Sequence, residues 1–142
     1  MARINVEEYN RISRERLPFA SDMGLRLDAI HEDHVVMRAV YSEKFLRPGG
    51  TVSGPVMMAL ADAAMYALVL SRIGPVELAV TTSLNINFLH RPKPGDVVAE
   101  ARMLKLGKRL AVGEVNLYSE GEDHDDPVAH VTATYSIPPE RR

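Results

Sequence analysis

A single aspartate interrupts the most apolar stretch of this chain. Asp62 is the only charged residue between Arg47 and Arg72, and it falls about two turns inside a predicted helix that otherwise has no polar face. Burying an unpaired carboxylate costs several kcal/mol. We therefore expect Asp62 to face a cleft, where it would act as a general base or as a nucleophile. The alternative is a structural carboxylate that faces water or pairs with a buried hydrogen-bond donor.

Ser53, Gly54 and Pro55 mark the entrance to the same helix. The first turn of a helix presents unpaired backbone N–H groups and a partial positive charge, so it attracts anions. Beside a carbonyl under attack, the N–H of Gly54 could stabilise the developing oxyanion, since glycine lets a substrate approach and Pro55 brings no competing donor. Taken alone, the motif is more typical of simple helix capping, with Ser53 or Gly54 as the cap.

The spacing of these two features predicts an oligomer. Eight helical residues separate Gly54 from Asp62, which is about 12 Å at a rise of roughly 1.5 Å per residue. A carboxylate and an oxyanion donor must both lie about 3 Å from one reacting carbonyl, so a single helix can hardly supply both. Two copies related by a two-fold axis can, with Gly54 of one subunit facing Asp62 of the other. We therefore expect a homodimer with two equivalent sites, and no activity from a monomer.

The hydrophobic pattern surrounds these residues with mixed α and β structure. Alternating apolar residues between turn signals predict strands, and a polar N-terminal segment predicts a short helix that stops at Leu17-Pro18. The long central helix is rich in Ala, Met and Leu, and a helix that is apolar all round must be buried on more than one side. The expected helices span 6–16 and 55–73, and the expected strands span 25–30, 35–41, 79–89, 96–106, 109–118 and 128–137.

These elements fit one architecture. The simplest arrangement is a curved antiparallel sheet wrapped around one long central helix, an α+β fold. At 142 residues the chain is long enough for one domain, and we expect a single domain over residues 1–142. The Gly/Pro-rich segment 47–55 is expected to be a loop that leads into the helix.

Composition excludes several functional classes. With 17 basic and 19 acidic residues the net charge is −2, which argues against a nucleic-acid partner. The absence of cysteine excludes a disulfide, a thiolate metal site and a cysteine nucleophile. His31 and His34 have a metal-like spacing, but no further cluster supports them, so no metal is expected. The charged N-terminus shows no secretory signal and Asp62 breaks the apolar stretch, so we expect a cytoplasmic protein with no membrane partner.

Several short motifs, in order along nearly the whole chain, resemble a known family. They are Leu17-Pro18-Phe19 with Met23-Gly24-Leu25, the segment 50–54, Asp62 in its helix, and the segments 85–92 and 105–109. Together they look like the hotdog-fold acyl-CoA thioesterases of the phenylacetate-pathway (PaaI-like) type. The resemblance implies a hotdog fold, dimers that pair into a homotetramer, and hydrolysis of a small, aromatic or medium-chain acyl-CoA thioester. It implies neither metal nor cofactor, because CoA is part of the substrate.

The resemblance also implies roles for individual residues. Asp62 matches the catalytic carboxylate of the family and Gly54 its oxyanion-hole glycine, while Thr81 falls near a small hydroxyl residue that positions the attacking water. Lys108 and Arg109 lie where such enzymes contact the CoA phosphates, although a solvated hairpin tip explains them equally well. The other expected substrate contacts are Arg47, Ser53, Met58, Tyr66, His90 and Arg91.

Three positions depart from the family pattern. Arg47 stands where the family commonly has Asn, Ser53 where it has His, and Pro55 where it has a second Gly. Ser53 could still cap the helix, and Arg47 could bind a carboxylate or a phosphate. These departures keep open an alternative function, a non-catalytic acyl-CoA-binding protein on the same fold. A hydratase is disfavoured, because such enzymes pair Asp with His and no His lies in or beside this helix.

Overall fold

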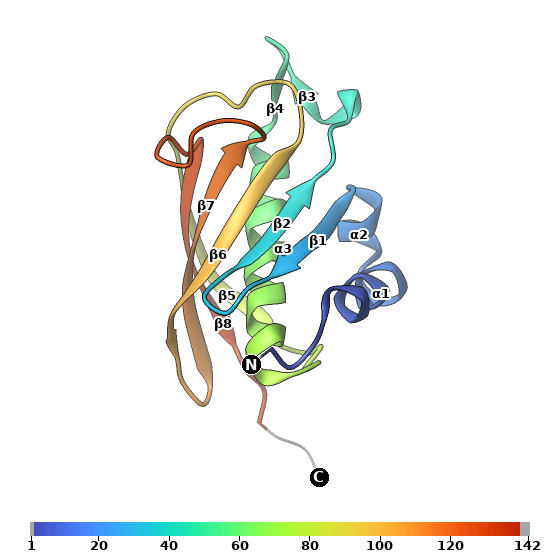
Figure 1. Ribbon diagram of the computed structural model, residues 1–142, viewed down its shortest axis with the longest axis vertical. Helices are drawn as coiled ribbons and strands as arrows, with labels where there is room; N and C mark the ends of the chain where they lie inside the picture. The colour runs from blue at the N-terminus through green and yellow to red at the C-terminus, as the bar shows by residue number, and fades with distance from the viewer. Residues whose placement is uncertain (1, 140–142) are drawn as a thin grey trace.

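A six-stranded antiparallel sheet curves around one long helix, α3 (Gly54–Ile73), in the computed structural model (Figure 1). The structure describes residues 2–139. The strands follow the order β1-β2-β6-β7-β8-β5, so consecutive strands β5 and β6 are not neighbours. Their bounds are β1 (Leu25–Ile30), β2 (Val35–Ala39), β5 (Val80–Phe88), β6 (Val97–Leu106), β7 (Leu110–Ser119) and β8 (Ala129–Ser136). The expected curved sheet around a central helix is confirmed.

The N-terminal helices lie beside the β1 edge of the sheet (Figure 1). Helix α1 (Val6–Arg16) begins at a capping box, in which Asn5 Oδ1 accepts the Glu8 N–H at 2.8 Å and the Glu8 carboxylate accepts the Asn5 N–H at 3.1 Å. A second helix, α2 (Pro18–Asp22), follows directly, because Pro18 suits the first turn of a helix as well as it ends the previous one. The sequence analysis missed α2.

The segment between β2 and α3 is more structured than the sequence indicates. It contains the short helix η1 (Glu43–Phe45) and two-residue strands β3 (Leu46–Arg47) and β4 (Thr51–Val52), which pair with each other. Strand β2 also ends at Ala39 rather than at Tyr41, because the Tyr41 N–H donates to Asp96 Oδ1 at 2.7 Å. That bond directs the chain away from the sheet and toward the start of α3.

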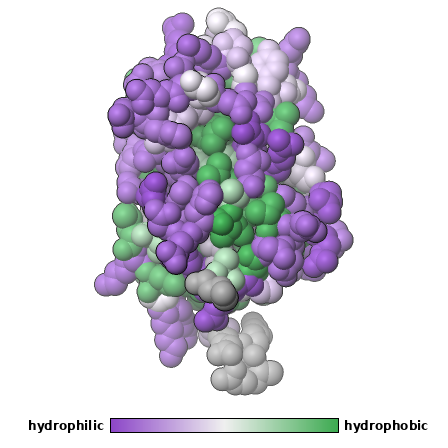
Figure 2. All heavy atoms as spheres, viewed as in Figure 1, coloured by the Kyte–Doolittle hydropathy of each residue, from purple (hydrophilic) through white to green (hydrophobic). Residues whose placement is uncertain are grey.

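Helix α3 forms the core of the protein. Most of its side chains are buried, and Leu60, Met65 and Leu68 are fully enclosed. Gly113 on β7 permits this close packing, since a Cβ there would lie 2.6 Å from Met65 Sδ. Hydrophilic residues cover most of the face in Figure 2, with hydrophobic residues visible mainly in its middle. Within residues 2–139, α3 alone has the length and composition of a membrane span, but 72% of its most apolar stretch is buried inside the protein.

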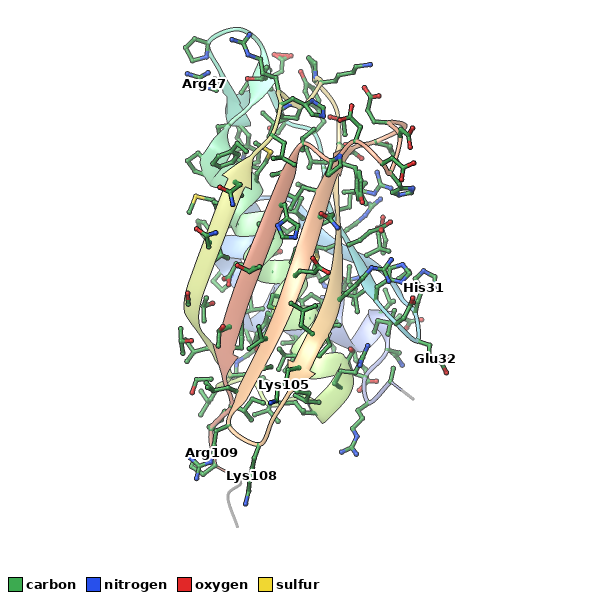
Figure 3. All side chains as sticks on the ribbon, turned by 90° about the vertical axis from the view of Figure 1, so that its left-hand side faces the viewer. His31, Glu32, Arg47, Lys105, Lys108 and Arg109 are labelled. Atoms are coloured by element: carbon green, nitrogen blue, oxygen red, sulfur yellow. The ribbon has the colours of Figure 1, made fainter. Side chains whose placement is uncertain are left out.

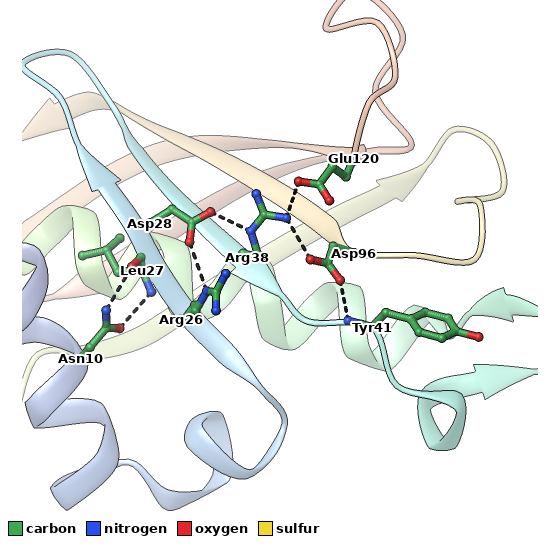
Figure 4. Close-up of polar contacts among 8 residues, drawn as sticks. All are labelled: Asn10, Arg26, Leu27, Asp28, Arg38, Tyr41, Asp96 and Glu120. Carbon is green, nitrogen blue, oxygen red and sulfur yellow. Dashed lines mark hydrogen bonds and ion pairs between the residues drawn. The ribbon is translucent and has the colours of Figure 1, made fainter.

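An arginine on β2 joins three acidic side chains from different parts of the chain (Figure 4). Arg38 Nε donates to Asp28 at 2.7 Å, and its Nη1 donates to Asp96 at 2.9 Å and to Glu120 at 2.5 Å. Burial alone would raise the pKa of Asp96, but the Tyr41 N–H and the Arg38 guanidinium bind its charged form and lower the pKa below its usual value. This ion-pair cluster ties β1, β2 and the two loops that flank β6 and β7.

We expect Arg38→Met to lower the free energy of unfolding by about 2–3 kcal/mol at pH 7, because half-buried carboxylates would lose their cation. Arg26→Met is the matched control: Arg26 also pairs with Asp28 but is 60% exposed, so its loss should cost less than about 1 kcal/mol. The pKa of Asp96 is lower in the folded protein than in the unfolded chain. Its contribution to the free energy of unfolding is therefore present above the unfolded pKa near 3.9 and is lost as the pH falls through the folded pKa. Urea unfolding between pH 3 and pH 7 should therefore show the Arg38 effect shrinking in acid. Equal losses for the two variants would contradict this account.

Candidate active site

The Asp62 carboxylate faces a cavity of about 430 Å³. The cavity lies between the N-terminal helices, α3, and the paired strands β5 and β8, and Asp62 itself is half-buried. Most of the lining is apolar or aromatic. Asp62 is the one acidic residue that α3 contributes to it. Side chains around Asp62 include Tyr9, Leu17, Phe19, Ala59, Ala63, Tyr66, Ala79, Val80, Thr81 and Tyr135.

Two hydroxyl groups hold the carboxylate in place. Thr81 Oγ1 donates to Asp62 Oδ1 at 2.5 Å, and the Tyr135 hydroxyl donates to the same oxygen at 2.9 Å. The Tyr135 hydroxyl also lies 3.0 Å from the backbone carbonyl of Asp62. Both donors bind Oδ1, and no hydrogen bond to Oδ2 comes from residues 2–139. One carboxylate oxygen is thus fixed while the other is open to a molecule in the cavity.

The sheet register brings these two hydroxyls together. Thr81 and Tyr135 are direct partners across β5 and β8, and a register irregularity follows between Thr81 and Ser83. Beyond the irregularity, Leu84 and Ile86 pack toward the core. Side chains alternate between the two faces of a regular strand, so Thr81, three residues before Leu84, would point outward if the strand were regular. The extra residue at this β-bulge places Thr81 on the inner face, beside Asp62.

Tyr135 is a functional candidate that the sequence analysis missed. Burial, and then the neighbouring charge of Asp62, raise its pKa well above the usual value. The phenol therefore remains protonated and can only donate to the charged carboxylate. A signal was available, because the predicted strand 128–137 alternates with Tyr135 on its apolar face, and a buried tyrosine hydroxyl needs a partner.

Gly54 lies at a second cavity, of about 300 Å³, at the start of α3. A Cβ at Gly54 would lie 3.2 Å from Phe88 Cζ, so this end of β5 covers the first turn of the helix. Ser53 is the N-cap residue, as expected, although its side chain makes no capping hydrogen bond. Arg47, His90 and Arg91 line this second cavity.

One chain does not bring all the expected site residues together. Tyr66 lines the Asp62 cavity, but its hydroxyl donates to the Glu77 carbonyl at 3.0 Å rather than to the carboxylate. Met58 is 42% exposed and lines neither cavity. Lys108 and Arg109 lie at the end of the molecule opposite Arg47 (Figure 3) and line a third cavity there. The expected contacts that line a cavity therefore fall into three separate places on the chain.

Comparisons with known proteins agree with the fold. The model of the thioesterase superfamily matches residues 49–124, which include both Gly54 and Asp62. The crystal structure of a candidate thioesterase from Silicibacter sp. TM1040 has a TM-score of 0.87 and 44% identity, and the match covers 98% of this chain and 95% of that one. These findings confirm the hotdog fold.

Two further relatives bear on the kind of thioesterase. A mutant of the phenylacetic acid degradation protein PaaI from Thermus thermophilus has a TM-score of 0.72 and 29% identity, over 85% of this chain and 99% of that one. The 1,4-dihydroxy-2-naphthoyl-CoA hydrolase of Listeria monocytogenes is 27% identical over 100 residues, covering 70% of this chain and 81% of its own length. The PaaI-like resemblance is thereby confirmed.

We expect Tyr135→Phe to lower the free energy of unfolding by about 1.5–3 kcal/mol at pH 7, the usual range for a hydrogen bond to a charged group. Tyr66→Phe is the comparison, because it removes a hydroxyl that binds a neutral carbonyl and should cost about 0.5–1.5 kcal/mol. A double-mutant cycle of Tyr135→Phe with Asp62→Asn, followed by urea unfolding, measures the coupling of the pair. A coupling near zero would show that the Tyr135 hydroxyl does not stabilise the charged carboxylate.

Proposed function

We propose that this chain, which belongs to the thioesterase superfamily, hydrolyses small, aromatic or medium-chain acyl-CoA thioesters at a site shared by two subunits. The observation that carries the proposal is the Asp62 carboxylate, fixed by Thr81 and Tyr135 at the wall of a largely apolar cavity. The CoA-thioester hydrolase among the relatives supports a CoA substrate. Water is the only other reactant, so the proposal includes no metal or cofactor.

Asp62 acts in this proposal as a general base. Its Oδ2 takes a proton from water, and the water oxygen attacks the carbonyl carbon of the thioester. The N–H of Gly54 from the partner subunit stabilises the oxyanion of the tetrahedral intermediate. The carbon–sulfur bond then breaks, the CoA sulfur takes up the proton, and the products are a carboxylic acid and the free thiol of CoA. Covalent attachment of the acyl group to Asp62, detected by mass spectrometry during turnover, would instead make Asp62 the nucleophile.

The exposed edge of the sheet supports a dimer. Strand β5 is nine residues long and pairs on one side only, with β8, whereas the opposite edge strand β1 packs against α1 and α2. Val80 and Phe88 on this edge are 57% and 50% exposed. Long apolar edge strands are normally covered, because their free backbone groups recruit other strands. A second copy of β5 satisfies those groups and extends the sheet across the two subunits.

The direction of β5 explains how such a dimer would complete the site. Thr81, beside Asp62, lies near one end of β5, and Phe88, against Gly54, lies at the other. A two-fold axis pairs a strand with its own copy in the antiparallel sense. Pairing centred near Leu84 therefore places the Asp62 end of one subunit opposite the Gly54 end of its partner. Two equivalent sites result, each with one carboxylate and one helix N-terminus.

The remaining expected contacts fit different parts of CoA. In the proposed dimer, Arg47, His90 and Arg91 come with the partner's Gly54 cavity, where cationic groups can meet a phosphate or the polar arm of CoA. Lys108 and Arg109 are at the end of the chain opposite Arg47 (Figure 3), which the proposed dimer places at the same end as the partner's Arg47, so we propose that they too meet CoA phosphates. Tyr66 contributes to the acyl pocket on the Asp62 side.

We expect the native protein to release thiol from an acyl-CoA panel, and Asp62→Asn to lower kcat by about 10²–10⁴-fold, the range for a general base. Asparagine keeps the shape, and its amide oxygen can still accept from Thr81 and Tyr135. Asp125→Asn, an exposed carboxylate outside both cavities, is the matched control and should leave kcat unchanged. A native protein that binds CoA esters by calorimetry but releases no thiol would support the non-catalytic binding protein instead.

We expect Gly54→Pro to be nearly inactive and Gly54→Ala to retain more activity, because both add a Cβ near Phe88 but only proline removes the N–H. Co-expression of Gly54→Pro with Asp62→Asn then tests whether the site is shared. Random mixing makes about half of the dimers mixed. In each mixed dimer, one of the two sites combines the intact Asp62 of one chain with the intact Gly54 of the other, so about a quarter of native activity should return. If the site lies within one chain, the mixture remains inactive.

A further inference from the structure

Helix α1 and the α2 segment form the wall of the Asp62 cavity that faces away from the sheet. Tyr9 and Arg16 of α1 line it together with Leu17, Pro18, Phe19 and Ala20. These residues all precede 49–124, the region shared with the superfamily. The carboxylate and the oxyanion glycine therefore lie in the shared region, whereas this wall of the cavity comes from a part of the chain outside it.

Tyr9 is the buried polar group of this wall. Its side chain is 1% exposed, and its hydroxyl makes no hydrogen bond with residues 2–139. The only fully enclosed side-chain nitrogen or oxygen without a partner in that range is Ser13 Oγ, so the Tyr9 oxygen still reaches open space. Because Tyr9 lines the cavity and is otherwise buried, that open space is the cavity itself.

Three tyrosine rings connect Asp62 with Tyr9. The Tyr135 ring, which binds the carboxylate, lies 6.1 Å from the Tyr66 ring, and the Tyr66 ring lies 6.2 Å from the Tyr9 ring in an edge-to-face arrangement. The hydroxyls of Tyr135 and Tyr66 are occupied by Asp62 and by the Glu77 carbonyl. Tyr9 is thus the third ring of the row, and its hydroxyl is the one that has no hydrogen-bond partner among residues 2–139.

We propose that Tyr9 is a specificity-determining residue whose hydroxyl binds a hydrogen-bonding group of the acyl chain. The inference rests on the proposed function, since it assigns the substrate class of the same cavity. The substrates it favours carry a hydroxyl, carbonyl or comparable group on the acyl chain in addition to the thioester. Phenylalanine would fill the same space without a polar atom, so the hydroxyl differs from it chiefly in the hydrogen bond that it can offer to a ligand in the cavity.

The chemistry of Tyr9 suits this role. Burial, and then the negative charges that Tyr66 and Asp62 carry when ionised, raise its pKa far above the usual value, so the phenol stays neutral and can both donate and accept. A pocket with a buried hydrogen-bonding group discriminates against a ligand that lacks the matching group, because the protein group is then left without a partner. The charged residues Arg16 and Glu77 also line the cavity, but they pair with each other at 3.5 Å, whereas the Tyr9 hydroxyl has no partner among residues 2–139.

The test uses thioether analogues of acyl-CoA, which bind but cannot be hydrolysed. Hexanoyl is compared with ω-hydroxyhexanoyl, and phenylacetyl with para-hydroxyphenylacetyl, by calorimetry on the full chain. We expect the native protein to bind the hydroxylated member of at least one pair about five- to tenfold more tightly. Tyr9→Phe should abolish that preference by weakening only the hydroxylated ligand. Tyr66→Phe, which removes an occupied hydroxyl from the same cavity, should keep the preference.

The outcomes separate this inference from the proposed function. Tyr9→Phe should unfold at the same or a higher temperature than the native protein, since it removes an unpartnered hydroxyl and keeps the ring. A preference that survives in Tyr9→Phe, an equal loss of affinity for both members of a pair, or no preference in the native protein would overturn the role of Tyr9. A native protein with the preference but no thiol release would overturn hydrolysis and leave the Tyr9 assignment intact.

Discussion

The site depends on keeping a carboxylate charged on the wall of an apolar core. Asp62 is carried by a helix whose buried side chains are mostly apolar, so the hydrogen bonds that Asp62 itself accepts must compensate for the water that it loses. Thr81 and Tyr135 supply them, from paired positions on adjacent strands. Because the Tyr135 phenol remains protonated, it cannot compete for the negative charge. The sheet register that pairs Thr81 with Tyr135 and the packing of α3 against the sheet therefore both determine how Asp62 Oδ1 is hydrogen-bonded.

Much of the architecture follows from the sequence because local signals agree with the global fold. Helix 6–16 and strand 25–30 match the structure at both ends, and the long helix begins one residue earlier than expected. Capping residues, prolines and alternation are local, so they can be found without tertiary contacts. Helix α2 and the β3–β4 pair were missed because five- and two-residue elements carry too little periodic signal. The early end of β2 depends on Asp96, which is distant in the sequence.

The candidate site was harder to predict, since its parts meet only through tertiary structure. Asp62 was visible as an exception within an apolar helix, and Gly54 as the start of that helix. No local signal places Thr81 on the inner face, because a bulge one residue later decides its direction. Tyr135 and Tyr9 look like ordinary core residues in the sequence. Their roles emerge from which hydroxyl has a partner and which does not, and that depends on all the elements packed around α3.

Strand β5 links stability to the site in a way that one subunit cannot reveal. Its inner face carries Thr81 at one end and covers Gly54 through Phe88 at the other, while its outer edge offers free backbone groups. In the proposed dimer, a partner strand that pairs with this edge would stiffen the bulge that aims Thr81 and, in the same step, supply the proposed oxyanion donor. An enzyme built in this way assembles its site only as it buries its most exposed edge. Under this proposal, association and catalytic competence depend on the same hydrogen bonds, and Asp62 and Gly54, about two helical turns apart on one chain, serve one reaction across two subunits.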